Sequence, residues 1–370
     1  MTTAVRAASW LPDVRITVAQ LASGILEYAE QFTSDSPFRL PYPANLQMAL
    51  DRLTLLSWHQ GVAPPGSVVE LLQVAHASFE EWPLDLADAE LDPEESLLAY
   101  GRPTVACEEL GMLRGDVEAE LRENELMHAV MDKSRAEEAP KSYVAFRKLL
   151  ISKPAITALD LDARLADPHL ALLSSEVRQA YADVPPEAIA DGIVRTCGGC
   201  HGLRLPLDDD RTWACVDDSC PDPSSVGPDH RAADGVLWLR RELRTFITGP
   251  GRAELRIADA VTNLGVAARL WPDFCTYDLS VFAKHSWVVD VKAWRNPIRL
   301  AHNLRERLFA VPKDAERAYI VIAREQVKSH SRYLDRLRKA CPAVRRGQRI
   351  VAVSEDQFLN AVRRRVEAER

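Results

Sequence analysis

An apolar run near the C-terminal end carries two charged residues that strongly restrict how it can fold. The sequence Trp-Val-Val-Asp-Val-Lys-Ala-Trp holds Asp290 and Lys292 two positions apart, which predicts a buried strand with both charged groups on one face. A second acid, Asp278, begins the strand-like run Tyr-Asp-Leu-Ser-Val-Phe, and a hairpin turn centred on Lys284 would place it opposite Asp290. Opposed side chains on antiparallel strands lie about 4.5–5.5 Å apart at Cβ, a separation that suits two carboxylates sharing a divalent cation. Burying such a cluster without a metal would be costly.

Composition is that of a globular protein with two or three domains. The chain has 370 residues, of which 47% are hydrophobic and 27% charged. Its sequence shows neither a membrane-spanning apolar run nor the features of a secretory signal, so a cytoplasmic location is expected. The net charge of −8 combines an acidic part, with 15 Lys+Arg and 30 Asp+Glu in residues 1–190, and a basic remainder. An acidic surface tends to meet protein, whereas a basic one attracts a polyanion.

Helical periodicity dominates the first half of the chain. Apolar residues recur at helical spacing in 16–32 and again in the two stretches that follow, and residues 116–150 are dense in helix formers. Proline residues near position 185 mark a linker. We therefore expect residues 1–185 to form a helical domain for partner docking or dimerisation. No catalytic constellation is found in this part of the sequence.

Four closely spaced cysteines follow the linker. Cys197, Cys200, Cys215 and Cys220 are separated by gaps of two, fourteen and four residues, which is typical of a structural zinc site with four thiolate ligands. We expect a small zinc ribbon over residues 193–230. Two alternatives remain open from the sequence: a histidine, His201 or His230, could replace one thiol, or the Cys-Gly-Gly-Cys motif could be redox-active. Redox chemistry of that kind would require the motif at the start of a helix.

The C-terminal part, residues 236–370, predicts an α/β domain with a mixed sheet. Residues 236–249 are interpreted as a helix that stops near Gly249 and Gly251, and the next helical stretch carries Glu254 near its start. Three strand-like runs, a basic helix, a strand, a helix, another strand and a final helix follow. The predicted fold class is thus α+β and multidomain, with a helical N-terminal domain, a small zinc ribbon and a C-terminal α/β domain.

This order of elements, with Glu254, Asp278 and the Asp-Val-Lys triplet at 290–292, resembles the restriction-endonuclease-like nucleases, whose signature is an acid followed by (D/E)-x-K. The resemblance implies a Mg²⁺-dependent DNA endonuclease. Asp278 and Asp290 would hold the Mg²⁺, Lys292 would contact the attacking water or the phosphate, and Glu254 would support a second ion or orient a water. Asp273, in a Pro-Asp pair, is an alternative first ligand, but its distance from the turn does not match that of Asp290.

The whole layout is similar to the nuclease component of bacterial pPIWI-RE three-gene defence islands, in which domain Y precedes the nuclease. That resemblance implies DNA as substrate, defence against plasmids or phage, and an Argonaute-like pPIWI-RE protein and a DinG-type helicase as partners. Cutting both strands usually needs two active sites, so a homodimer is expected. No membrane partner is expected. Two other classes remain: a noncatalytic DNA-binding or assembly subunit, and a transcription factor that reads DNA through the ribbon.

Overall fold

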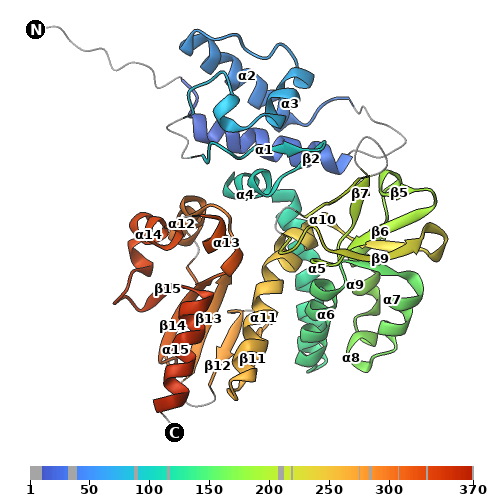
Figure 1. The fold of residues 1–370 in the computed structure, drawn as a ribbon, viewed down its shortest axis with the longest axis vertical. Helices are drawn as coiled ribbons and strands as arrows, with labels where there is room; N and C mark the ends of the chain where they lie inside the picture. The colour runs from blue at the N-terminus through green and yellow to red at the C-terminus, as the bar shows by residue number, and fades with distance from the viewer. Residues whose placement is uncertain are drawn as a thin grey trace, which may run out of the picture. The chain divides into compact units, whose positions relative to one another are not determined.

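The computed structural model describes residues 11–31, 40–86, 91–114, 117–206, 212–217, 220–274, 276–282, 286–306, 308–330 and 332–368. The chain divides into two compact units, Met1–Asp116 and Val117–Arg370 (Figure 1). This division does not coincide with the boundary expected at residue 185. The helices between Val117 and that point pack with the C-terminal half, because their apolar faces share a core with residues such as Leu243 and Trp271.

The first unit is mainly helical, as expected. Its elements are α1 (Val14–Gln31), α2 (Ala44–Gln60), α3 (Val68–His76), a 3-10 turn η1 (Phe79–Glu81), the short strands β1 (Leu98–Ala99) and β2 (Arg102–Pro103), and α4 (Val105–Arg114). The Ser67 side chain caps α3 by accepting a hydrogen bond from the Glu70 amide, which satisfies a donor that the first helical turn leaves unpaired.

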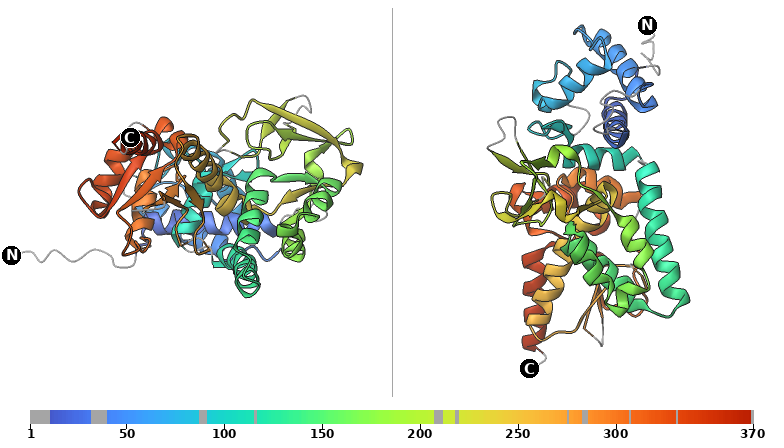
Figure 2. Two further views of the ribbon diagram at one scale, coloured as in Figure 1. Left: turned by 90° about the horizontal axis from the view of Figure 1, so that it is seen from below. Right: turned by 90° about the vertical axis from the view of Figure 1, so that its right-hand side faces the viewer.

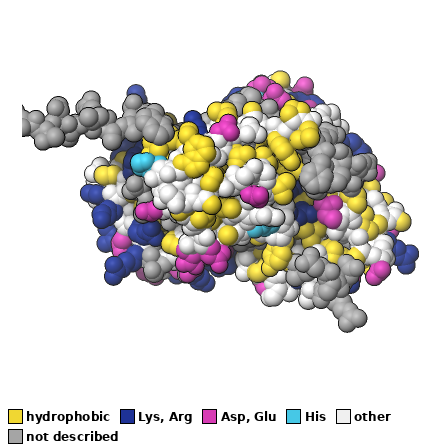
Figure 3. Space-filling model, turned by 90° about the horizontal axis from the view of Figure 1, so that it is seen from above, with side chains coloured by type: hydrophobic (Ala, Val, Ile, Leu, Met, Phe, Trp, Pro, Cys, Tyr) yellow, Lys and Arg dark blue, Asp and Glu magenta, His cyan; other side chains and the backbone are white. Residues whose placement is uncertain are grey.

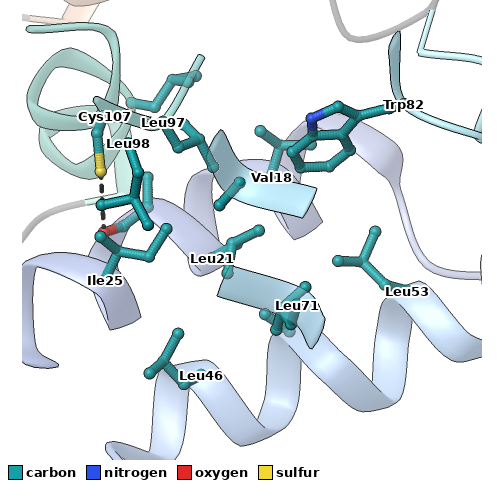
Figure 4. Packing of buried hydrophobic residues seen from close by; sticks show 14 of the residues in the cluster. Val18, Leu21, Ile25, Leu46, Leu53, Leu71, Trp82, Leu97, Leu98 and Cys107 are labelled. Carbon is teal, nitrogen blue, oxygen red and sulfur yellow. Dashed lines mark hydrogen bonds between the residues drawn. The ribbon is translucent and has the colours of Figure 1, made fainter. Parts of the chain in front are cut away.

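A single apolar core holds this unit together (Figure 4). Leu21 and Ile25 of α1 pack with Leu46 of α2 and with residues of the later segments, and the Cys107 thiol donates to the Ala22 carbonyl at 3.6 Å. Side chains buried at this density contribute about 1.5–3 kcal/mol each relative to exposure. The amphipathic pattern of the sequence is therefore explained by one shared core rather than by isolated helices.

The second unit begins with helices interleaved with a small antiparallel sheet. The helices are α5 (Val117–Ala136), α6 (Pro140–Ser152), α7 (Ala158–Leu165), α8 (Pro168–Ala171) and α9 (Ser174–Ala180). The sheet has the order β3-β10-β4, with β3 (Ala155–Thr157), β4 (Tyr181–Asp183) and β10 (Val236–Leu239). The sequence did not predict this sheet, because its strands are only three or four residues long.

The prediction of a single helix over residues 236–249 is wrong. Its first part, Val-Leu-Trp-Leu, forms β10, followed by a short α10 (Arg241–Leu243), a π-helical turn η5 (Arg244–Thr248) and then α11 (Gly249–Asn263). Gly249 and Pro250 therefore begin a helix instead of ending one. Proline is tolerated in the first helical turn, where the missing N–H would have no intrahelical partner.

The cysteine-containing segment lies between two neighbouring strands. It contains η3 (Pro186–Ala188), β5 (Ile189–Ala190), β6 (Ile193–Cys197), β7 (Arg204–Pro206), β8 (Trp213–Cys215), β9 (Val226–Arg231) and η4 (Ala232–Asp234). The strands form the antiparallel arrangements β5-β6-β9 and β7-β8. β4 and β10, the strands before and after this segment, pair antiparallel with each other, and Asp183 lies opposite Leu237. The whole segment is therefore an insertion within a β-hairpin.

The C-terminal sheet has five strands in the order β11-β12-β13-β14-β15, formed by β11 (Ala268–Leu270), β12 (Leu279–Val281), β13 (Trp287–Lys292), β14 (Arg317–Ile322) and β15 (Ile350–Ser354). The first three strands are antiparallel and the last three parallel, so the predicted mixed sheet is confirmed. The expected hairpin register is also confirmed, because Leu279 pairs with Val289 and Val281 with Trp287. Lys284, the predicted centre of the turn, lies outside the described residues.

Helices cover both faces of this sheet (Figures 1 and 2). α11 and α15 (Glu355–Ala368) pack on one face, where Ile257 and Phe358 contact the core around Val289. The other face is covered by α12 (Pro297–Glu306) and α14 (Tyr333–Ala340), through Leu300 and Leu337. The remaining elements of this layer are α13 (Arg324–Ser329) and η6 (Pro342–Val344). None of the described helices combines the length and the apolarity needed to cross a bilayer.

Candidate active site and metal site

The β12–β13 hairpin brings two acids together at its open end. The Asp278 amide donates to the Val289 carbonyl at 3.0 Å, just beyond the last paired residues, Leu279 and Val289. The two acids lie close enough for the charge of Asp290 to act on Asp278. The Asp278 carboxylate accepts a hydrogen bond from the Val291 amide at 2.7 Å. Both acids are buried, with exposed fractions of 7% and 8%. Both acids are thus buried at the same end of the hairpin, while their direct pairing stays a prediction, because the paired residues end at Leu279 and Val289.

Lys292 supplies a cation to the same site. Its Nζ donates to Asp290 Oδ1 at 2.9 Å. Burial alone would lower the pKa of Lys292, but the negative charges of Asp290 and Asp278 outweigh burial, and the pKa is raised above its usual value. The ammonium group thus keeps its proton at neutral pH.

Glu254 lies in the second turn of α11 and is 2% exposed. Its Oε2 accepts hydrogen bonds from Trp271 Nε1 and from Arg147 Nη2, the latter at 3.3 Å. Burial raises the pKa of Glu254, although Arg147 and the Trp271 hydrogen bond act in the opposite direction. The carboxylate is therefore held by two side chains while remaining close enough to Asp290 and Lys292 to interact with their charges.

The electrostatics of these acids favour a bound cation. Burial, together with the charges of Glu254 and Asp290, holds the pKa of Asp278 well above its usual range. An oxygen-only donor set with like charges in a buried position suits Mg²⁺, which keeps several waters and needs only one or two carboxylates. The three acids do not form a tight ligand set: in the described parts of the chain, only the cysteine cluster has three or more ligand atoms within 4.8 Å of one another. Asp278 and Asp290 offer oxygen donors of the kind that such an ion takes, and Glu254 interacts with the charges of both.

Asp273, the alternative acid of the sequence analysis, lies elsewhere. It is exposed, in a loop where Trp271, Asp273 and Phe274 all have positive φ angles of 45°, 50° and 59°. Non-glycine residues rarely adopt this conformation, and here it turns the chain between β11 and β12. The structure brings together Glu254, Asp278, Asp290 and Lys292, and leaves Asp273 at the surface.

Two residues at the site were missed by the sequence analysis. Trp271 and Arg147 both contact Glu254, and the Arg147 guanidinium also lies 4.7 Å from the centre of the Trp271 ring. Arg147 belongs to α6, more than a hundred residues before Glu254 along the chain. No motif connects an arginine in a helical segment with a distant acid, so only the folded structure shows this contact.

The arginine-rich region after β13 has more than one role. Arg299 is buried at 3% exposure, Arg305 donates to the Ala340 carbonyl at 2.7 Å, and Arg338 donates to the Ala352 carbonyl at 2.6 Å. Burial or a bond to a backbone carbonyl thus ties each of these three arginines to the fold. Arg332 and Arg336 are exposed. The face drawn in Figure 3 mixes hydrophobic, acidic and basic side chains, so it is not a uniformly basic surface.

The four cysteines of the insertion form a compact cluster. Cys197 and Cys220 have their sulfurs 3.6 Å apart, and Cys200 and Cys215 have theirs 3.4 Å apart. Four Zn–S bonds of about 2.3 Å would keep the sulfurs about 3.8 Å apart, whereas a disulfide requires about 2.05 Å. The cluster therefore fits a four-thiolate metal site, and none of its cysteines is disulfide-bonded. His201 and His230 are not part of it.

The backbone around the cluster also fits a metal. The Gly202 amide points at Cys200 Sγ at 3.4 Å and the Asp217 amide at Cys215 Sγ at 3.5 Å, as in a thiolate-binding knuckle. A Cβ at Gly199 would lie 2.9 Å from Cys220 Sγ, so only glycine fits there. Hydrogen bonds from the neighbouring thiols Cys200 and Cys215 lower the pKa of Cys220 to about 5. A thiolate is thus available to a metal at neutral pH.

Replacing Asp278 by asparagine is expected to stabilise the second unit in Mg²⁺-free buffer by about 1 kcal/mol. Asparagine can still accept the Val291 amide, but it removes a charge whose burial and repulsion by Glu254 raise the pKa of Asp278. Because the folded-state pKa is raised, the gain is small at acidic pH, where the carboxyl group is protonated, and grows as the pH rises. Urea unfolding at several pH values measures it. Asp273→Asn, at an exposed position, serves as the control, and equal or lower stability of Asp278→Asn would contradict the argument.

Comparison with known families gives two matches within the chain. Residues 17–157 match the family described as pPIWI_RE three-gene island domain Y, and residues 251–370 match the family described as REase associating with pPIWI_RE. No curated protein and no solved structure gives a match. Glu254, Asp278, Asp290 and Lys292 lie in the second matched region, Arg147 lies in the first, and the cysteines lie between the two. The chain is therefore a pPIWI-RE island protein that carries domain Y and the associated REase domain.

Proposed function

We propose that this protein is a Mg²⁺-dependent DNA endonuclease that acts in prokaryotic defence against plasmids or phage. The observation that carries the proposal is the burial of Asp278 and Asp290 at the same end of the β12–β13 hairpin, with Lys292 bonded to Asp290. The match of residues 251–370 to a REase family supports it independently of this geometry.

The residues of the site have separate roles in phosphodiester hydrolysis. Asp278 and Asp290 would hold the magnesium ion, which when bound would neutralise charge on the phosphate and lower the pKa of a water ligand. Lys292 stays protonated beside Asp290 and can stabilise the negative charge that develops as water attacks phosphorus and the bond to the leaving oxygen breaks. Glu254, held by Trp271 and Arg147, would orient a water.

The other parts of the chain would serve binding and assembly. The four-cysteine cluster would hold a structural zinc ion, because four thiolates leave no open position for a water. Exposed arginines on either side of α14, such as Arg332 and Arg346, are candidates for contacts with DNA phosphates. Membership of the pPIWI-RE island supports partnership with other island proteins, for which an Argonaute-like protein and a DinG-type helicase are the candidates, and homodimerisation would allow both strands to be cut. We place this activity in the cytoplasm, where plasmid or phage DNA is met.

Plasmid cleavage tests the proposal directly. The protein, alone and with its island partners, is incubated with supercoiled plasmid and Mg²⁺, and nicked and linear products are quantified. Cleavage that requires Mg²⁺, is not supported by Ca²⁺ and is lost in Asp290→Ala is expected. If the parent protein binds DNA but does not cut it even with its partners, the noncatalytic DNA-binding or assembly role is correct. The observation that keeps this second role in view is that the oxygens of Glu254, Asp278 and Asp290 do not all lie within 4.8 Å of one another.

A further inference from the structure

Arg147 makes a buried ion pair that joins the two matched regions of the chain. Its Nη2 lies 3.3 Å from Glu254 Oε2, and the two side chains are only 6% and 3% exposed. The guanidinium also stacks 4.7 Å from the centre of the Trp271 ring, and Trp271 donates to the same carboxylate. Removing one partner of a buried pair leaves the other charge uncompensated, which is strongly unfavourable. The Glu254 carboxylate is therefore held firmly where Arg147 can pair with it.

The geometry distinguishes a positioning contact from a blocking one. An arginine that blocked the carboxylate would bind both of its oxygens in the bidentate manner that guanidinium groups favour. Here Arg147 and Trp271 both bind Oε2, and among the described residues no hydrogen bond is made to Oε1. One oxygen is thus fixed and the other is left for a water or a cation.

Neighbouring contacts from the same helices support the segment that leads to Asp278. Tyr143 of α6 packs edge-on against Phe274, with ring centres 5.4 Å apart, and the guanidinium of Arg135 in α5 lies 4.8 Å from the same ring. The Trp271 amide in turn donates to the Asp278 carbonyl at 2.8 Å. The α5–α6 pair therefore contacts the loop on both sides of Asp273 and reaches the backbone of a proposed metal ligand.

We propose that Arg147 is a positioning residue of the nuclease centre, which holds Glu254 by one oxygen and leaves the other free to act at the site. This inference rests on the proposed function. It also assigns α6, which lies within the region matched by domain Y, to the wall of the centre formed by the REase region. α6 and the REase region then form one functional unit.

Cleavage kinetics of Arg147→Ala test the inference. We expect the single-turnover rate to fall about 100-fold, since misplacement of a group at the site by about 1 Å has an effect of this size. The concentration of DNA needed for half-maximal rate should not change, because the Arg147 side chain is buried. Guanidinium ion at low millimolar concentration should restore part of the rate by occupying the space beside Trp271, whereas the same concentration of urea should not.

Matched variants separate this role from a structural one. Arg178→Ala removes an arginine from an exposed pair with Asp162 in the same unit and should leave the rate unchanged. Cleavage by Arg147→Ala at the rate of the parent protein overturns the inference. A rate that falls together with the unfolding midpoint, and that guanidinium does not restore, also overturns it, because such a loss reflects stability alone. If the parent does not cut DNA, or if Asp290→Ala cuts equally well, the proposed function itself fails and this inference fails with it.

Discussion

Lys292→Ala is expected to slow Mg²⁺-dependent DNA cleavage by about 100- to 1,000-fold, because it removes a preorganised cation from the point where negative charge develops. The ammonium group is bonded to Asp290 and is held in its charged form by Asp290 and Asp278. Single-turnover cleavage of a labelled duplex at saturating protein measures this loss without a contribution from product release.

Metal binding should respond in the opposite direction to cleavage. Removing the positive charge of Lys292 leaves Asp278 and Asp290 less neutralised, so a divalent cation should bind at least as tightly as to the parent. Titration with Ca²⁺, which does not support cleavage, tests this by calorimetry. Lys328→Ala, at an exposed position in α13, should change neither property. Normal cleavage by Lys292→Ala would remove this lysine from the mechanism.

Cys200→Ser is expected to abolish stoichiometric zinc binding and to unfold the inserted ribbon. Zinc binding by small four-ligand modules contributes about 10–16 kcal/mol of apparent free energy at neutral pH, far more than a core of this size can supply. The ribbon core has few members, centred on Val194, Leu203 and Trp238. Mass spectrometry of the native protein measures the zinc content, and limited proteolysis reports whether residues 189–231 become cleavable.

Two variants serve as controls for the zinc site. His201→Ala should keep one zinc per chain, because His201 is exposed and lies outside the cysteine cluster. Cys341→Ser should also keep it, since this buried cysteine belongs to the core beneath α14. Full zinc content in Cys200→Ser, or its loss in His201→Ala, would contradict the four-thiolate site.

Local patterns were sufficient to predict the centre of the C-terminal sheet. Alternation of apolar and polar residues defined β13, and the equal distance of Asp278 and Asp290 from a turn gave the register of the hairpin. The spacing of Cys197 and Cys200 from the second cysteine pair likewise predicted their convergence. In each case the residues that matter lie within about twenty-five positions of one another, so the alternation along a strand or the geometry of a turn is enough to relate them.

The sequence failed where distant segments decide the structure. Residues 236–239 lead directly into a stretch with helical character, so the sequence predicted one helix over both. They form β10 instead, because β3 and β4 offer hydrogen-bonding partners on both sides. The boundary near residue 116 depends on which core the apolar faces of α5 and α6 join. The contact between Arg147 and Glu254 depends on that same packing. None of these contacts can be predicted from the periodicity of a short stretch of sequence.

The attachment of the ribbon has a consequence for how this architecture can vary. Its two ends leave and re-enter the fold at adjoining positions of β4 and β10, so its length can change without shifting the register of any strand outside it. The module is thus exchangeable: a lineage could enlarge it, shorten it to a tight turn or substitute another binding element while the Asp278–Asp290 hairpin stays intact. The ion pair between Asp217 of the ribbon and Arg252 of α11, at 2.7 Å, is a contact that such an exchange would have to replace.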